Sequence, residues 1–255
     1  MWFYVENSQI TEHDIRITGA DVNHIRNVLR MKQGDHLTIC DGEGTDYQCQ
    51  IESLTPGEVV ARIVEMGQNE TELPARIYLF QGLPKKDKME LIIQKAVELG
   101  VYEIIPVAMK RCVVKLEDPK KEQKKLGRWQ TIADSAAKQC GRGILPKVKE
   151  VMTLEQAAEY ASGLSKRLVP YELAQGMAQS HRAVKEAAKA SSVGVFIGPE
   201  GGFDQAEMDM LLKKDAEPIT LGRRILRTET AGLTALSILM FEMEGMGENE
   251  YGSLS

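Results

Sequence analysis

Two short glycine-bearing stretches near the C-terminus constrain the fold of this chain more than any other feature. One reads Ile-Gly-Pro-Glu-Gly-Gly-Phe over residues 197–203, and the other reads Leu-Gly-Arg-Arg-Ile-Leu-Arg-Thr-Glu-Thr-Ala over residues 221–231. Each follows a short apolar run typical of a buried strand, at 193–197 and 218–221, and each precedes a predicted helix. Repeated in this way, a strand, a glycine loop and a helix predict an α/β fold with a ligand crevice at the carboxyl ends of its strands.

Cap signals support both of these helices. Asp204 and Glu207 have the spacing of an N-cap residue and its reciprocal partner in a capping box. Thr228 can cap the second helix, whose apolar residues follow helical spacing at Leu233, Leu236, Leu239 and Met240. Both glycine loops are therefore expected to end at a helix N-terminus.

The glycines allow a ligand to approach the backbone closely, so that main-chain N–H and C=O groups can bind a nucleotide-like molecule. Neither stretch has the Lys-Ser/Thr of a P-loop or the spacing of a dinucleotide site, which disfavours a phosphate cradle. The second stretch places Arg223, Arg224 and Arg227 on one tight turn. This cluster indicates an anionic partner, and two ordinary turns with solvent-facing arginines are the alternative that the residues alone leave open.

The two motifs GPEGGF and LGRRILRTETA resemble the signature of the RsmE family, bacterial methyltransferases of the SPOUT superfamily, and further matching stretches cover nearly the whole chain. The resemblance implies a SPOUT-type α/β domain whose last segment forms a deep trefoil knot, preceded by a small PUA-like β-barrel domain. It also implies a homodimer, with S-adenosylmethionine bound in the knot loops. The cofactor-binding residues carried over are Gly198, Pro199, Glu200, Gly201, Gly202, Leu221, Gly222, Ile225 and Leu226.

The family's reaction is methyl transfer from S-adenosylmethionine to N3 of one uridine of 16S rRNA, at the decoding centre of the small ribosomal subunit. A neutral imide is a poor nucleophile, so the site needs hydrogen-bond donors that favour the N3 anion. In this chain, Arg227 is the predicted catalytic arginine and Arg224 the predicted positioning arginine. Glu229 is a candidate proton acceptor, and equally a first-turn acid stabilised by the helix dipole.

Length and composition set further bounds. The 255 residues leave room for one large or two modest domains. No apolar run is long enough to span a bilayer, and the first residues lack a secretory signal, so a cytoplasmic location is expected. The four cysteines form no C-x-x-C pair and the four histidines are scattered, so no metal site is expected.

Positive charge is concentrated in the middle of the chain. Residues 73–149 carry 17 lysines and arginines against 8 aspartates and glutamates, whereas the whole chain has a net charge of −5. This asymmetry predicts a surface that meets a polyanion, here 16S rRNA or an assembled small ribosomal subunit. For the lysine-rich run at 120–125 alone, a solvated helix face is the alternative.

Residues 1–72 are predicted to form the separate β-rich domain, with strands at 2–6, 36–41, 46–53 and 59–66. A helix is predicted over 20–31, with an apolar face of Val22, Ile25, Val28 and Leu29. The resemblance makes Arg30 an RNA contact, whereas the residues alone favour an arginine that binds helix-terminal carbonyls. Trp2 departs from the family, whose members commonly have arginine at this position.

Residues 73–245 are predicted as the methyltransferase domain and 246–255 as a polar tail. Strands are expected at 77–83, 101–109 and 168–173, and helices at 87–99, around 129–140 and at 180–189. Asp87 is expected to cap the first of these helices, and Glu90 to complete its capping box. Lys85 and Lys88 at its start oppose the helix dipole, which favours an anionic partner.

The predicted RNA-binding residues are therefore Arg30, Lys85, Lys88, Arg111 and Arg142. For Arg142, a helix-terminal arginine is the alternative. Three other functions stay open from the sequence: a SPOUT enzyme that acts on tRNA or 23S rRNA, a non-catalytic ribosome-assembly factor, and a phosphate-binding α/β enzyme that uses GPEGG as an anion loop.

Overall fold

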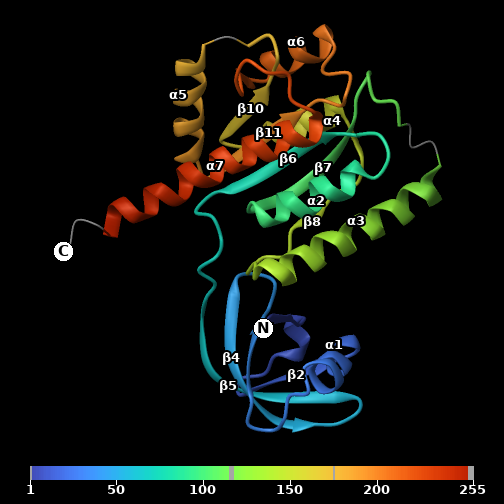
Figure 1. The fold of residues 1–255 in the computed structure, drawn as a ribbon, viewed down its shortest axis with the longest axis vertical. Coiled ribbons are helices and arrows are strands. Elements are labelled where there is room, and N and C mark those ends of the chain that lie inside the picture. Colours follow the sequence, from blue (N-terminus) through green and yellow to red (C-terminus); the bar gives the residue numbers. More distant parts are fainter. Residues whose placement is uncertain (1, 115–117, 175, 252–255) are drawn as a thin grey trace. The chain divides into compact units, whose positions relative to one another are not determined.

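The computed structural model describes residues 2–114, 118–174 and 176–251 (Figure 1). It divides into two compact units. Unit 1 comprises Met1–Glu72 together with Ala137–Leu145, and unit 2 comprises Leu73–Ala136 and Pro146–Ser255. A single boundary between residues 72 and 73 does not anticipate that the short segment 137–145 packs with the N-terminal residues.

Unit 1 is built on one five-stranded sheet, in the order β1-β3-β4-β5-β2. β1 runs parallel to β3, and the other neighbours are antiparallel. Its strands are β1 (Trp2–Tyr4), β2 (Asp14–Thr18), β3 (His36–Cys40), β4 (Thr45–Leu54) and β5 (Glu58–Gln68), and its short helices are η1 (Asn7–Gln9), α1 (Ala20–Asn23) and η2 (His24–Val28). Sequence reasoning missed β2, although Ile15 and Ile17 alternate with polar residues and are both buried.

The predicted helix over 20–31 is correct in type and wrong in detail. α1 changes after one turn into the π-helical η2, which ends at Val28. A π-turn contains one residue more than an α-turn, so it rotates the following side chains away from the expected face. Val28 is consequently 63% exposed, whereas Val22 and Ile25 are buried as predicted.

Unit 2 contains a seven-stranded sheet in which every pairing is parallel. The order is β12-β10-β11-β6-β7-β8, and β9 also pairs with β7. The strands are β6 (Arg76–Gly82), β7 (Val101–Ala108), β8 (Lys147–Val148), β9 (Met152–Thr153), β10 (Lys166–Pro170), β11 (Ser192–Ile197) and β12 (Glu217–Ile219). The predicted α/β class is confirmed.

Helices cover both faces of this sheet. α2 (Lys88–Glu98) and α5 (Met177–Ala188) flank the long α7 (Thr228–Tyr251) on one face, and α4 (Leu154–Ala161) and α6 (Gln205–Lys213) pack on the other (Figure 1). α3 (Pro119–Cys140) completes the set. The sequence reading made no prediction for α4, although Thr153 and Gln156 form a capping box at its start.

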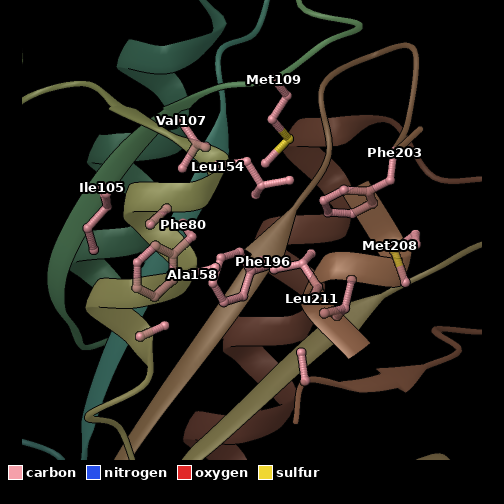
Figure 2. Packing of buried hydrophobic residues seen from close by; sticks show 14 residues of the cluster. Phe80, Ile105, Val107, Met109, Leu154, Ala158, Phe196, Phe203, Met208 and Leu211 are labelled. Carbon is pink, nitrogen blue, oxygen red and sulfur yellow. The ribbon is translucent and has the colours of Figure 1, made fainter. Parts of the chain in front are cut away.

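A continuous apolar core lies between the sheet and the α4–α6 layer (Figure 2). The rings of Phe80 and Phe196, from neighbouring strands, stack with centroids 4.3 Å apart. Met208 and Leu211 of α6, together with Phe203 just before it, extend this core towards the end of β11. The core thus fixes the loop that follows β11, which is the first glycine-bearing stretch.

Three local predictions have different outcomes. The capping box of α6 is confirmed, because Asp204 accepts from the backbone of Ala206 and Glu207 accepts from the backbone of Asp204. The box of α2 is wrong: the Asp87 side chain makes no capping bond, and the Glu90 carboxylate instead accepts from Arg128. Part of the predicted polar tail is helical, because α7 continues to Tyr251, and residues 252–255 lie outside the described part of the chain.

Candidate functional site

A pocket of about 320 Å³ lies at the carboxyl ends of β10, β11 and β12. Both glycine-bearing stretches line it, as the alternation of strands and loops predicted. The volume is at the lower end of the range for pockets that bind small molecules and cofactors, about 300–1,000 Å³. The pocket is lined by apolar residues (Pro170, Ile197, Pro199, Phe203, Leu221, Ile225, Leu226, Ala231), polar or charged residues (Lys88, Tyr171, Glu172, Glu200, Thr220, Arg224, Arg227, Thr228) and the glycines Gly198, Gly202 and Gly222.

The first glycine loop is held against neighbouring backbone too closely for larger residues. A Cβ atom on Gly82, at the end of β6, would lie 2.7 Å from the backbone nitrogen of Pro199. A Cβ atom on Gly201 would lie 2.9 Å from the Cβ of Arg111. Gly202 has a φ of 66°, which lies in the left-handed region that favours glycine. Sequence reasoning assigned Gly201 and Gly202 to ligand approach, and the structure shows that close packing at Gly82 and Gly201 also requires glycine.

Thr228 joins three segments of the site instead of capping α7. It is the first residue of the helix, and its hydroxyl donates to the Gly198 carbonyl at 2.7 Å. The same hydroxyl accepts from the Gln81 side-chain amide at 2.9 Å, and that side chain is fully buried. The prediction of an N-cap was wrong in this respect. The bond network fixes the start of α7 to the ends of β6 and β11.

The second stretch presents its arginines to the pocket and to solvent. Arg223, Arg224 and Arg227 are all exposed, and within the described parts of the chain none has a carboxylate within ion-pair distance. In the same unit, by contrast, the guanidinium of Arg167 binds three backbone carbonyls. Arg224 and Arg227 line the pocket, so their guanidinium groups are available to a ligand or substrate there.

Lys88 lies between two carboxylates at the edge of the pocket. Its Nζ atom is 3.2 Å from Oε1 of Glu200 and 3.1 Å from Oε2 of Glu229. These contacts raise the pKa of the Lys88 ammonium, the hydrogen bond to Glu229 contributing most. Partial burial would raise the pKa of Glu200, but the Lys85 backbone N–H and Lys88 outweigh it and lower that pKa. Lys88 therefore acts within the protein as the partner of two site residues.

Two more of the predicted RNA-binding residues adjoin the first glycine loop. The backbone N–H of Lys85 donates to Glu200 at 3.0 Å, and its side chain is exposed. The Arg111 guanidinium donates to the Gly201 carbonyl at 3.0 Å while 49% of the side chain stays exposed. The structure thus brings Lys85, Lys88 and Arg111 together around residues 198–202, although the two lysines follow β6 and Arg111 follows β7.

Arg30 and Arg142 belong to unit 1. Arg30 is exposed and has a φ of 54°, a left-handed conformation that ends the η2 helix. Arg142 is only 4% exposed, and its Nε and Nη2 atoms donate to the two carboxylate oxygens of Glu72 at 2.8 and 2.7 Å. A buried, bidentate guanidinium is not available to a phosphate. The geometry therefore supports the alternative structural role for Arg142 over an RNA contact.

Trp2 also has a local explanation in unit 1. A Cβ atom on Gly141, which has a φ of 73°, would lie 3.3 Å from the indole Nε1 of Trp2. The indole therefore packs directly on the backbone of the 137–145 segment.

Gln81 and Gly82 are the site residues that sequence reasoning missed, and their only signal was a polar residue and a glycine at the end of a buried strand.

Two known families of RNA methyltransferase domains match this chain. The family described as "RNA methyltransferase domain" matches residues 71–240, and the family "RNA methyltransferase PUA domain" matches residues 17–64. The ribosomal RNA small subunit methyltransferase E of Bacillus subtilis is 41% identical over 231 residues, which cover 89% of this chain and 90% of the relative.

Two solved structures that are similar to this chain contain bound S-adenosylmethionine. A putative methyltransferase of Legionella pneumophila, in complex with S-adenosylmethionine, is 32% identical with a TM-score of 0.80, over 94% of this chain and 96% of that one. The ribosomal RNA small subunit methyltransferase E of Neisseria gonorrhoeae, bound to S-adenosylmethionine, is 29% identical with a TM-score of 0.80 and the same coverage.

The parallel sheet, the pocket at its carboxyl edge and the accompanying PUA-like unit define an RNA methyltransferase. The class of enzyme expected from the two motifs is thereby confirmed. More narrowly, the chain belongs to the ribosomal RNA small subunit methyltransferase E family.

Proposed function

We propose that this enzyme transfers a methyl group from S-adenosylmethionine to N3 of one uridine in 16S rRNA, at the decoding centre of the small ribosomal subunit. S-adenosylmethionine is the methyl donor, as expected from the sequence. The observation that carries the proposal is the pocket formed by the two glycine-bearing stretches, lined by Arg224 and Arg227, which have no carboxylate partner among the residues that the structure describes.

The pocket fits the donor in size and in chemistry. Backbone at Gly198 and Gly222 can bind the polar edge of an adenine ring, because glycine has no side chain to separate these groups from the pocket. Leu221 and Leu226 supply apolar surface for the ring itself. We assign cofactor binding to the residues predicted from the two motifs: Gly198, Pro199, Glu200, Gly201, Gly202, Leu221, Gly222, Ile225 and Leu226.

The acceptor requires help because uracil N3 carries a proton in its neutral form. Methyl transfer forms the N3–C bond and breaks the C–S bond of the sulfonium, and the N3 proton must leave. Arg227 is the proposed catalytic residue, because a guanidinium directed at the flanking carbonyls stabilises the N3 anion. Arg224 positions the base. Both side chains have the exposure that this role needs, and neither forms an ion pair within the described part of the chain.

Glu229 is a weaker candidate for proton acceptor than the sequence implied. Its Oε2 atom is shielded from solvent and lies 3.1 Å from the ammonium of Lys88. A carboxylate engaged in this way has an evident structural role. We propose that water at the open side of the pocket accepts the N3 proton and that Glu229 serves as the partner of Lys88.

Lys85 and Arg111 are the proposed RNA contacts of unit 2, and Arg30 is the proposed contact of unit 1. Because N3 lies on the Watson–Crick edge, any base pair must open and the uracil must turn into the pocket before transfer. Phosphate contacts beside the glycine loop would hold the flanking nucleotides during this step. Binding through such contacts weakens steeply as salt increases.

We also propose a homodimer and a trefoil knot in the C-terminal segment. Ile238 and Phe241 on α7 are 37% and 75% exposed, and Leu91 on the adjacent α2 is 46% exposed, which leaves an apolar face for a second copy. For the knot, the support is that α7 returns after β12 to the ends of β6 and β11, where Thr228 binds both. The reducing cytoplasm is the proposed location.

The experiment that tests the choice of RNA uses radiolabelled S-adenosylmethionine and purified acceptors that lack the modification. Small ribosomal subunits, free 16S rRNA, 23S rRNA and bulk tRNA are incubated with the enzyme in parallel. The proposal predicts label in the small subunit or in 16S rRNA alone. Preferential labelling of 23S rRNA or tRNA would assign the same chemistry to another RNA.

A further inference from the structure

Within the function proposed above, we propose that Lys88 is a positioning residue of the cofactor pocket rather than an RNA contact. Its ammonium links the loop at 198–202 to the first turn of α7 through Glu200 and Glu229. Both segments line the pocket, so their separation sets its shape.

The environment of Lys88 explains why the ammonium serves the protein. The side chains of Lys88, Glu200 and Glu229 are 26%, 25% and 16% exposed, so all three are partly shielded from water. A lysine that contacts phosphate needs its charge directed outwards, whereas this one lies within 3.2 Å of two carboxylates. The Lys85 backbone N–H holds the same Glu200 carboxylate and so fixes it from a second side.

Loss of the ammonium has a definite electrostatic consequence. The group of three carries two negative charges and one positive charge, and without Lys88 two carboxylates face each other with no counter-charge between them. Their repulsion favours a wider separation of the 198–202 loop from the start of α7. The donor would then bind only those molecules in which the two segments have returned to the binding geometry. Its apparent affinity is the intrinsic affinity multiplied by the fraction of molecules in that geometry.

The test compares Lys88→Met, Lys88→Arg and the control Lys95→Met, which removes an exposed ion-paired lysine from the same helix. Isothermal titration calorimetry gives the Kd for S-adenosylmethionine, and filter binding gives the affinity for 16S rRNA at several salt concentrations. For Lys88→Met the donor Kd should rise about three- to tenfold, in line with the loss of two partly shielded ion pairs. Lys88→Arg should restore most of the affinity, and Lys95→Met should not change it.

Turnover kinetics add a second readout. The KM for the donor should rise in Lys88→Met, whereas kcat at saturating donor stays within about twofold, because a positioning role is satisfied once the donor is bound. Glu200→Gln and Glu229→Gln should each weaken donor binding in the same direction. Combined with Lys88→Met, Glu200→Gln should cost little more, since the two residues share one interaction.

Several outcomes would overturn the inference. If Lys88→Met leaves the donor Kd unchanged but lowers RNA affinity and reduces its salt slope by about one, the lysine contacts phosphate. If only Lys88→Met weakens donor binding and the two glutamine variants do not, the ammonium contacts the donor directly. Tighter donor binding by Lys88→Met would mean that the two unpaired carboxylates attract the cationic sulfonium of the donor more than the loss of positioning weakens its binding. A wild-type enzyme that binds no S-adenosylmethionine would contradict the proposed function itself.

Discussion

Replacing Arg142 tests whether this arginine stabilises unit 1 or binds RNA. Glu72 accepts four hydrogen bonds in the structure, from Nε and Nη2 of Arg142 and from the backbone of Gly143 and Ile144. Arg142→Met removes the two charged donors and leaves a carboxylate that is 17% exposed. Breaking a buried ion pair on one side costs about 3–5 kcal/mol, and the partial exposure of Glu72 favours the lower end, about 3 kcal/mol.

Hydrogen exchange of the full-length protein measures this loss where it occurs. A destabilisation of about 3 kcal/mol should speed exchange of the most protected amides in β3, β4 and β5 by roughly a hundredfold, because each 1.4 kcal/mol is a factor of ten. Amides in β6 and β11 of unit 2 should exchange at the wild-type rate. The result follows from the structure because the segment 137–145 packs with unit 1.

Two variants serve as controls. Lys138 lies in the same segment 137–145, and Lys138→Met breaks its exposed ion pair with Asp21. The loss of stability should stay below about 1 kcal/mol. Arg142→Lys keeps the charge but loses the two-point contact, so its effect should lie between the other two. Unchanged exchange in Arg142→Met, together with weaker RNA binding, would refute the structural role and restore the RNA contact.

Three further predictions concern the site and the buried thiols. Gly82→Ala should weaken S-adenosylmethionine binding, measured by calorimetry, and lower the melting temperature. The reason is that the new Cβ would lie 2.7 Å from the Pro199 nitrogen. Normal binding would show that the loop moves freely. Arg227→Gln should lower kcat by roughly 10²–10³ with donor affinity retained, and unchanged single-turnover rates would remove the catalytic role. Burial raises the pKa of Cys40 to about 12 and that of Cys49 to about 11, from 9.0. Unit 1 should therefore lose stability as pH rises from about 9 towards 12, since only unfolding lets these thiols ionise. Denaturant titrations at several pH values measure this loss. An unchanged pH dependence in Cys40→Ala would contradict the prediction.

Strong local periodicity made much of the fold predictable. The alternation of apolar strands and helices from residue 77 onwards agreed with the α/β class of the larger unit, and the spacing of Asp204 and Glu207 identified a capping box that forms as expected. Short elements carried too little pattern: β2 has five residues, and the π-turn after Asn23 depends on tertiary packing that no spacing reveals.

The candidate site was predictable where residues lie in one motif and not where the fold brings distant residues together. The two glycine-bearing stretches line one pocket as expected. Lys88 and Arg142 were interpreted as RNA contacts because an isolated sequence shows their charge but not their partners. Those partners, Glu229 and Glu72, lie far along the chain and meet these side chains only in the folded protein.

The central claim is the methylation of uracil N3 by this pocket, and identification of the product nucleoside tests it most directly. Small ribosomal subunits lacking the modification are treated with the enzyme and S-adenosylmethionine, and the digested rRNA is compared by mass spectrometry with standards of 3-methyluridine, 5-methyluridine and 2′-O-methyluridine. The account predicts 3-methyluridine at a single position of 16S rRNA, and its absence with Arg227→Gln. A methyl group on carbon 5 or on the ribose would contradict it, because neither reaction requires the N3 anion that the arginine is proposed to stabilise.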